Sequence, residues 1–136
     1  MPWTGEPGAG FTTGRPWLQI GPDAARRNVA AEEADEGSVL AAYRRLLAAR
    51  RSVAALRRGS YESLDAGVVD VFAWRRVAGR SRAVVAVNFA AEDRRIRLPA
   101  GEARRAVAGT HLDPPAPDPD DVLALRPFEG VILADG

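Results

Sequence analysis

The chain contains no cysteine and a single histidine, and both scarcities limit the chemistry open to it. Without cysteine it can form neither a disulfide nor a thiolate metal site, so its composition permits a reducing compartment. The lone His111 excludes any site that needs two histidines, and no Gly-x-Ser-x-Gly motif offers it a nucleophile. We interpret His111 as a polar loop residue, and we expect no metal and no cofactor.

Long hydrophobic runs and lysine are missing as well. No stretch approaches the roughly 18 uninterrupted apolar residues of a membrane span, and residues 1–6 lack the features of a signal peptide. We therefore expect a cytoplasmic protein without a membrane partner. All 19 basic residues are arginine and the net charge is only +1, which argues against a uniformly basic nucleic-acid binder.

What is present suits one small globular domain with an appendage, because 46% of the 136 residues are apolar and 27% are charged. Residues 1–34 are rich in glycine, proline and tryptophan and show no sustained period, which predicts a long loop that is either functional or lies against something else. The glycines at positions 5, 8 and 10 do not predict a phosphate-binding loop, since no strand precedes them.

Residues 35–57 predict one amphipathic helix, with Ser38 as its N-cap and Gly59 as its stop. Its apolar stripe recurs at three- and four-residue steps and contains Val39, Tyr43, Leu46, Leu47 and Val53. Between Ser38 and Gly59 lie six arginines and no acid, so the polar face is strongly positive. We interpret that face as the outer side of a docked helix; the alternative is a nucleic-acid-binding face.

From Gly59 onward the apolar period changes to two, which predicts short strands separated by turns. The expected strands cover residues 60–64, 68–77, 82–89, 94–98, 104–110, 122–125 and 131–133. Two nearly continuous apolar runs, 68–74 and 83–89, are typical of strands buried on both faces, whereas Arg95 and Arg97 alternate with apolar residues. The fold class is mainly β: a small antiparallel β-sandwich preceded by a long loop and one amphipathic helix.

Candidate functional residues are few. The carboxylates at 32, 33, 35 and 36 form a charged run before the helix, and those at 118, 120 and 121 lie among prolines. Neither group predicts the pair of carboxylates on rigid elements that glycoside hydrolysis needs. Three aromatic residues, Trp3, Phe11 and Trp17, crowd into the glycine-rich loop. Such rings either stack on sugars or anchor the loop to its own scaffold.

Several segments resemble α-glucosidases of the α-amylase superfamily, glycoside hydrolase family thirteen. The similar stretches are residues 1–3 and 9–18, the helix over 38–51, the strand segments 59–61, 71–76 and 83–89, and the closing 125–133. In oligo-1,6-glucosidases and trehalose-synthase relatives a Pro-Met-Gln-Trp motif is followed by Gly-Phe-Thr and Pro-Trp-Leu. This sequence has Pro2-Trp3 where many relatives have Gln before Trp.

The resemblance implies that residues 1–57 are the last βα loop and final helix of a (β/α)8 barrel, and that residues 58–136 are the C-terminal sandwich domain. The family cleaves α-glucosidic bonds with retention through two aspartates and a glutamate on earlier barrel strands. Neither a Phe-Arg-x-Asp nor an Asn-His-Asp motif occurs here, so no residue is assigned as catalytic. The loop bearing Trp3, Phe11 and Trp17 would border the substrate pocket.

In that family the methionine matching Met1 is internal, so we expect a segment of a longer reading frame: a miscalled start, a split gene or a deliberately cloned piece. We expect it to be inactive alone, with the missing barrel as its partner, an α-glucoside as the substrate of the full-length enzyme, and self-association through the exposed helix face. The alternative is a stand-alone carbohydrate-binding or interaction module. Bond specificity, and hydrolysis versus isomerisation, stay open.

Overall fold

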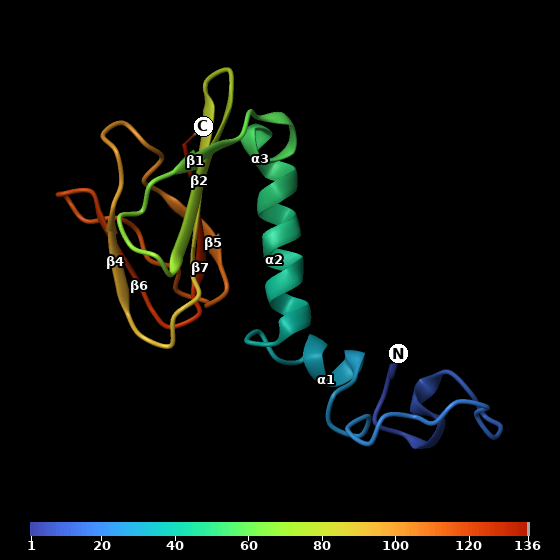
Figure 1. Ribbon diagram of the computed structural model, residues 1–136. Coiled ribbons are helices and arrows are strands. Elements are labelled where there is room, and N and C mark those ends of the chain that lie inside the picture. Colours follow the sequence, from blue (N-terminus) through green and yellow to red (C-terminus); the bar gives the residue numbers. More distant parts are fainter. Residues whose placement is uncertain (136) are drawn as a thin grey trace. The chain divides into compact units, whose positions relative to one another are not determined.

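The computed structural model describes residues 1–135 and divides the chain into two compact units. The first unit runs from Met1 to Arg44, and the second begins at Arg45 (Figure 1). This division falls within the longest helix, α2 (Val39–Ser52). The domain boundary predicted after residue 57 stays a prediction.

The first unit consists mostly of irregular chain with two short helical elements. These are a 3-10 helix, η1 (Pro7–Gly10), and a five-residue α-helix, α1 (Val29–Glu33). The loop predicted over residues 1–34 is therefore interrupted twice. Elements of this length contain little more than one turn, so they leave no hydrophobic period that sequence analysis can detect.

The helix predicted over residues 35–57 is present as two helices, α2 and the short α3 (Ala54–Arg58). Val53 separates them in an extended conformation, with φ −95° and ψ 114°. The expected ends are confirmed: the Ala41 N–H donates to Ser38 Oγ at 3.1 Å, and the Gly59 N–H donates to the Ala55 carbonyl at 2.9 Å. The prediction of a single unbroken helix is therefore wrong, because the helix is interrupted at Val53.

The second unit contains two antiparallel sheets. The larger has the order β1–β2–β3–β7–β5, and the smaller pairs β4 with β6. Their bounds are β1 Glu62–Leu64, β2 Val71–Ala78, β3 Ser81–Asn88, β4 Arg94–Arg97, β5 Ala106–Gly109, β6 Val122–Leu125 and β7 Gly130–Asp135. Every expected strand is found within or close to its predicted range. The β-rich, antiparallel fold class is confirmed.

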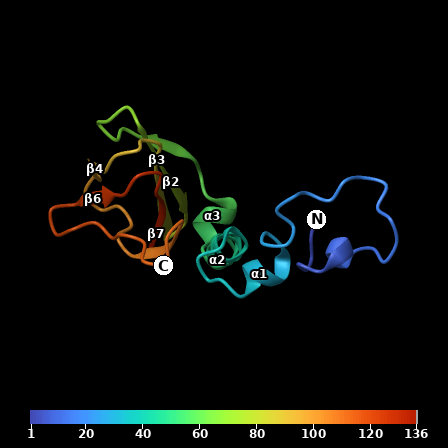
Figure 2. The same ribbon diagram turned by 90° about the horizontal axis from the view of Figure 1, so that it is seen from below.

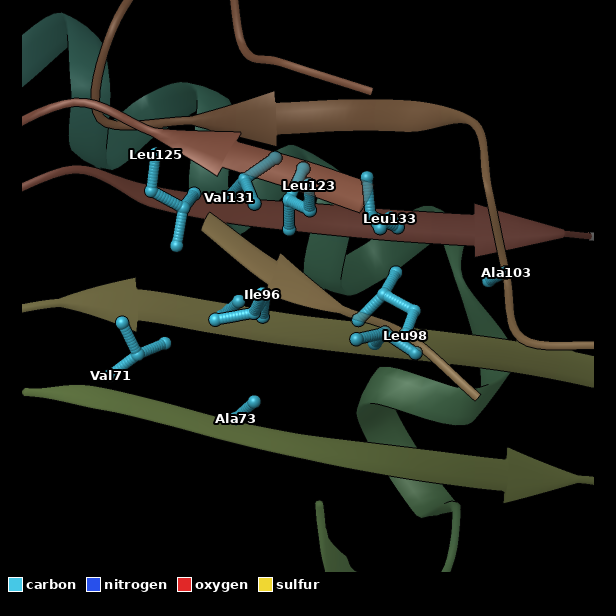
Figure 3. Packing of buried hydrophobic residues seen from close by; sticks show 11 residues of the cluster. Val71, Ala73, Ile96, Leu98, Ala103, Leu123, Leu125, Val131 and Leu133 are labelled. Carbon is cyan, nitrogen blue, oxygen red and sulfur yellow. The ribbon is translucent and has the colours of Figure 1, made fainter. Parts of the chain in front are cut away.

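The main hydrophobic core lies between the two sheets (Figure 3). Ile96, Leu123 and Leu125 of the small sheet pack together with Val131 and Leu133 of the large one, and all five are almost fully buried. On the other side of the large sheet lies α3, as Figure 2 shows. The sandwich thus has one face of its large sheet in the core and part of the other face beneath a helix.

The two strands expected to be buried on both faces differ. In β3, Val84 and Ala86 enter the main core while Ala83 lies beneath α3, which confirms the prediction for this strand. Strand β2 begins only at Val71, and its Phe72 is 46% exposed, so burial of both its faces is a wrong prediction. The apolar run of β2 looks like that of a central strand, but its outward face lies beyond the part that α3 covers.

Candidate functional site

The N-terminal loop, which carries the candidate aromatic residues, is fixed by backbone hydrogen bonds. The Trp3 N–H donates to the Ala9 carbonyl at 2.8 Å. The Val29 and Ala30 N–H groups donate to the carbonyls of Pro2 and Trp3 at 3.2 and 3.0 Å. Because the first N–H groups of a helix have no partner within it, the start of the chain satisfies two open donors of α1.

A turn at residues 8–10 decides where Trp3 and Phe11 lie. Gly8, Ala9 and Gly10 all have positive φ values, of 82°, 52° and 75°. A Cβ on Gly10 would lie 3.0 Å from the Trp3 Cβ, so glycine is required there by both conformation and space. Ala9, at the middle of this turn, is the one buried apolar residue among residues 1–34.

All three candidate aromatic residues are accessible. Trp3 is 49% exposed, Phe11 is 50% exposed and Trp17 is 93% exposed. Phe11 and Trp17 border the same hollow of about 490 Å³, together with Arg15, Gln19 and neighbouring residues of the loop. Trp3 does not line it. The structure thus brings two of the three together.

The hollow combines flat apolar surface with planar polar groups. Aromatic faces accept the C–H side of a sugar ring, and the guanidinium of Arg15 and the amide of Gln19 can bond hydroxyl groups. Sequence reasoning overlooked Arg15 and Gln19, although both lie within two residues of Trp17. Sugar contact by Trp3, Phe11 and Trp17 stays a prediction.

The acidic run before α2 has a structural use. One Glu32 carboxylate oxygen accepts from the Leu40 N–H at 3.1 Å, and Glu33 pairs with Arg44 at 2.6 Å. The Asp35 carboxylate accepts from the Gly37 N–H at 2.8 Å. Carboxylates near the first turn also suit the positive end of a helix dipole. These acids therefore stabilise the start of α2.

The acids of the proline-rich loop are engaged in a similar way. Asp118 accepts from the Val122 N–H at 2.9 Å, and Asp121 forms an ion pair with Arg104. His111 is exposed nearby in the sequence. Among residues 1–135, no three acidic or histidine side chains gather in a group that could hold a metal ion.

One buried carboxylate stands apart. Glu129 is fully buried and accepts hydrogen bonds from the Arg126 backbone N–H and Nε at 2.8 and 3.1 Å. Burial raises the pKa of the Glu129 carboxyl, but the bonds and charge of Arg126 outweigh it, so the pKa lies below its ordinary value. Arg126 also lowers the pKa of the exposed Asp113 through a hydrogen bond. The sequence offered one signal for this pair: Arg126 and Glu129 lie three residues apart between two predicted strands.

This pair fixes a turn between strands. The fully buried Asn88 donates from Nδ2 to the carbonyls of Arg126 and Glu92, each at 2.8 Å, and its Oδ1 accepts from the Ala90 N–H at 2.9 Å. The polar groups of Asn88 and Glu129 are thus partnered within the fold. We assign this cluster a structural task, with no acid or base freely available for catalysis.

Comparison with known proteins shows which family the chain resembles and how much of its relatives' length it spans. A family model described as the catalytic domain of alpha amylase matches residues 1–59. The chain is 30% identical to a probable oligo-1,6-glucosidase 2 of Bacillus subtilis (strain 168), over 99% of the chain and 24% of that protein. It is also 30% identical to a trehalose-6-phosphate hydrolase of Escherichia coli (strain K12), over 96% of the chain and 24% of that protein.

Solved structures show the same similarity to α-amylase-family enzymes and the same partial coverage. The trehalulose synthase MutB from Pseudomonas mesoacidophila MX-45 superposes with a TM-score of 0.85 and 36% identity, over 98% of this chain and 24% of that one. The chain therefore spans about a quarter of the length of the relatives that it matches.

Proposed function

Because this chain belongs to the α-amylase family and spans only about a quarter of its relatives' length, we propose that it is the C-terminal, non-catalytic portion of an α-glucosidase-type glycoside hydrolase. The complete enzyme would cleave α-glucosidic bonds with retention in the cytoplasm. This portion would comprise the last loop and helix of the barrel (residues 1–57) and the C-terminal sandwich domain (58–136). Its task would be to stabilise the barrel.

The observation that carries the proposal is that the matches span nearly all of this chain but only about a quarter of each relative. It is supported by the use made of four of the acids, Glu32, Glu33, Asp118 and Glu129, which cap a helix or turn or form ion pairs. A retaining glycosidase needs two carboxyl groups facing each other across about 5 Å of open space. None of the acids is proposed as catalytic.

The surface of α2 supports a docked position for this helix. Val39, Tyr43 and Leu47 follow one another at four-residue steps, and all three are exposed. Burying side chains of this size contributes about 1.5–3 kcal/mol each. We propose that this stripe packs against the barrel, and that without the barrel it promotes self-association. Val53, expected on the same stripe, instead packs beside Ala55 and Leu56 at the helix break.

In the complete enzyme, Trp3, Phe11 and Trp17 would border the substrate pocket and contact an α-glucoside or oligosaccharide. The shared hollow of Phe11 and Trp17 supports this assignment more directly for these two than for Trp3. The relatives include proteins named for oligo-1,6-glucosidase, trehalose-6-phosphate hydrolase and trehalulose synthase activities, so they leave bond specificity open.

Hydrolysis of p-nitrophenyl α-glucoside by the highly purified chain tests the proposal. We expect no turnover above buffer, with an intact oligo-1,6-glucosidase as the positive control. A Trp17→Ala variant serves as a matched preparation, since an impurity would give equal turnover in both. Turnover that copurifies with the chain and persists through refolding contradicts the proposal.

The second candidate is a stand-alone carbohydrate-binding module, and the hollow beside Phe11 and Trp17 favours it. It predicts a monodisperse protein whose tryptophan fluorescence is quenched by maltose-type sugars. Quenching that disappears in Trp17→Ala but survives in Trp74→Phe would favour this candidate. Fluorescence unaffected by millimolar sugar in all three proteins would remove it.

A further inference from the structure

A second hollow, of about 770 Å³, is bordered by the end of α2, the start of α3 and the large sheet. Small-molecule sites in proteins commonly measure about 300–1,000 Å³. Ser52 and Ala54 border it on the helical side, and Ser81, Val107 and Ala134 border it from β3, β5 and β7. We call it the helix–sheet hollow, and all of its lining residues belong to the second unit.

The floor of the helix–sheet hollow is apolar and fixed in place. Val107 packs against the small core beneath α3, which contains the buried Ala134. The Ala134 N–H donates to the Arg105 carbonyl at 2.9 Å, and the Ala55 N–H donates to Ser81 Oγ at 3.1 Å. Because helix and strands are joined in this way, the hollow is preformed, which lowers the cost of binding a ligand.

The rim of the hollow carries guanidinium groups that the described fold does not use. Arg105 lines the hollow and is exposed, and its side chain forms no hydrogen bond or ion pair within residues 1–135. Arg51 and Arg80 directly adjoin the lining residues Ser52 and Ser81, and both are likewise exposed and unpaired within this range. Such a local excess of positive charge attracts an anion.

Asp135 is the one acid among the lining residues. Its Oδ1 accepts from the Arg104 N–H at 3.3 Å, and its Oδ2 has no partner within residues 1–135. A carboxylate oxygen accepts from a hydroxyl group of a ligand but repels a bare anion. Together with Arg105, Asp135 therefore favours a ligand that carries both an anionic group and hydroxyl groups.

A phosphorylated sugar combines these groups in one small molecule. A guanidinium donates two parallel N–H bonds to a phosphate, and the C–H side of a sugar ring packs on methyl groups such as those of the floor. A neutral sugar would leave Arg105 without a partner. An extended phosphate polymer would gain nothing from Asp135, which repels it.

We propose that the helix–sheet hollow binds a small phosphorylated sugar, with the phosphate on Arg105, the ring over Val107 and Ala134, and a hydroxyl group on Asp135. This site shares no residue with the loop that carries Phe11 and Trp17. The inference therefore does not depend on the proposed function.

Calorimetric titration of the free chain at about 0.15 M salt tests the inference. The probes are glucose 6-phosphate, glucose and inorganic phosphate, and the first variant is Arg105→Gln. Arg95→Gln is the matched control, because it removes the same charge from an exposed arginine of β4 that has no partner within residues 1–135. Strand β4 belongs to the small sheet, on the other side of the large sheet from α3.

We expect Arg105→Gln to weaken binding of glucose 6-phosphate at least about ten-fold, because charge-assisted hydrogen bonds are lost. Arg95→Gln should change it less than about two-fold, since salt screens a distant exposed charge. Glucose and inorganic phosphate should each bind at least about ten-fold more weakly than glucose 6-phosphate, because each makes only part of the contacts.

Asp135→Ala separates the two halves of the ligand. It should weaken binding of glucose 6-phosphate at least about three-fold, because a hydroxyl acceptor is lost. Inorganic phosphate should bind no more weakly to this variant, since a repelling charge is removed. Equal weakening of both probes would show that Asp135 only supports the fold, and would overturn its assignment.

Three results would overturn the whole inference: no binding of glucose 6-phosphate, equal weakening by Arg105→Gln and Arg95→Gln, or equal affinity for inorganic phosphate. Tighter binding of an oligothymidylate that Arg105→Gln abolishes would assign the rim to a nucleic acid and also overturn it. If Arg105→Gln does not fold, amide chemical shifts of the unsubstituted chain decide. Glucose 6-phosphate should shift Val107 and Ala134, whereas shifts confined to residues 11–21 would contradict the proposal.

Discussion

The two compact units are stabilised in different ways. Among residues 1–44, only Ala9, Asn28 and Ser38 are buried, and two of these three act through hydrogen bonds at helix starts. From Arg45 onward, a set of aliphatic side chains including Leu123, Leu125 and Leu133 fills the space between two sheets. Apolar burial is the main driving force of folding. The first unit is therefore a shaped segment with little core of its own, whereas the second has what an independent domain requires.

The strongest test of this contrast makes one chemical change in both units. Leu133→Ala removes a fully buried side chain from the core and should cost about 2–5 kcal/mol of the free energy of unfolding, since Leu133 is 0% exposed. Leu18→Ala removes a largely exposed side chain from the first unit and should cost less than about 0.5 kcal/mol. Urea denaturation followed by far-UV circular dichroism measures both. Equal costs would refute the contrast.

The second test concerns the polar cluster of the second unit. Glu129→Gln removes the charge that accepts from Arg126 and should cost about 1.5–3 kcal/mol at neutral pH. Because the pKa of Glu129 is lowered below its ordinary value of 4.5 in the folded protein, its stabilisation is present above that value. It is lost as the pH falls through the folded pKa.

The stability difference between the unsubstituted chain and Glu129→Gln should therefore shrink below about pH 4.5 and be constant above it. Urea denaturation from pH 3 to pH 7 measures it. Glu92→Gln is the control, because Glu92 forms an exposed pair with Arg94 and should change stability by less than about 1 kcal/mol. A difference that grows toward acid would contradict the assignment.

A third test compares two glycines. A Cβ on Gly59 would lie 2.5 Å from the Ala55 carbonyl oxygen, so Gly59→Ala must displace the end of α3 and should cost about 1–3 kcal/mol. Gly21, in the first unit, has no atom within 4 Å of its added Cβ, so Gly21→Ala should be neutral or slightly stabilising. Thermal unfolding of both variants decides it. A neutral Gly59→Ala would show that α3 is loosely attached.

Sequence patterns predicted much of the second unit because alternating apolar and polar residues place apolar side chains on one face of a sheet and polar ones on the other. Arg95 and Arg97 are exposed and Ile96 is buried, as their alternation predicts. The break at Val53 escaped prediction because the group that accommodates it is distant in sequence: the Ala55 N–H donates to Ser81 Oγ, 26 residues away, instead of to a helical carbonyl. Helical periodicity carries no information about such a partner.

The candidate site was predicted only in part, for a similar reason. Glycine between aromatic residues indicated an exposed loop, and Phe11 and Trp17 are indeed exposed. These two share a hollow that Trp3 does not line, and the nearby left-handed turn at Ala9 is a conformation that alanine rarely adopts and that the sequence does not predict. The buried Glu129 escaped notice because its partner Arg126 lies in a segment that reads only as a turn.

The smallest expected effect lies in the first unit. Ser38 Oγ accepts from the Ala41 N–H and donates to the Glu32 carbonyl at 2.6 Å, so Ser38→Ala removes an N-cap worth about 1 kcal/mol. We expect amide exchange in the first turn of α2 to quicken roughly five-fold, as seen by NMR, with Ser63→Ala of exposed β1 as the control. Because the first unit has little core, the urea midpoint followed by the sheet should not move. If Ser38→Ala lowers that midpoint as Leu133→Ala does, the two units unfold as one cooperative structure, and the contrast between them describes packing but not stability.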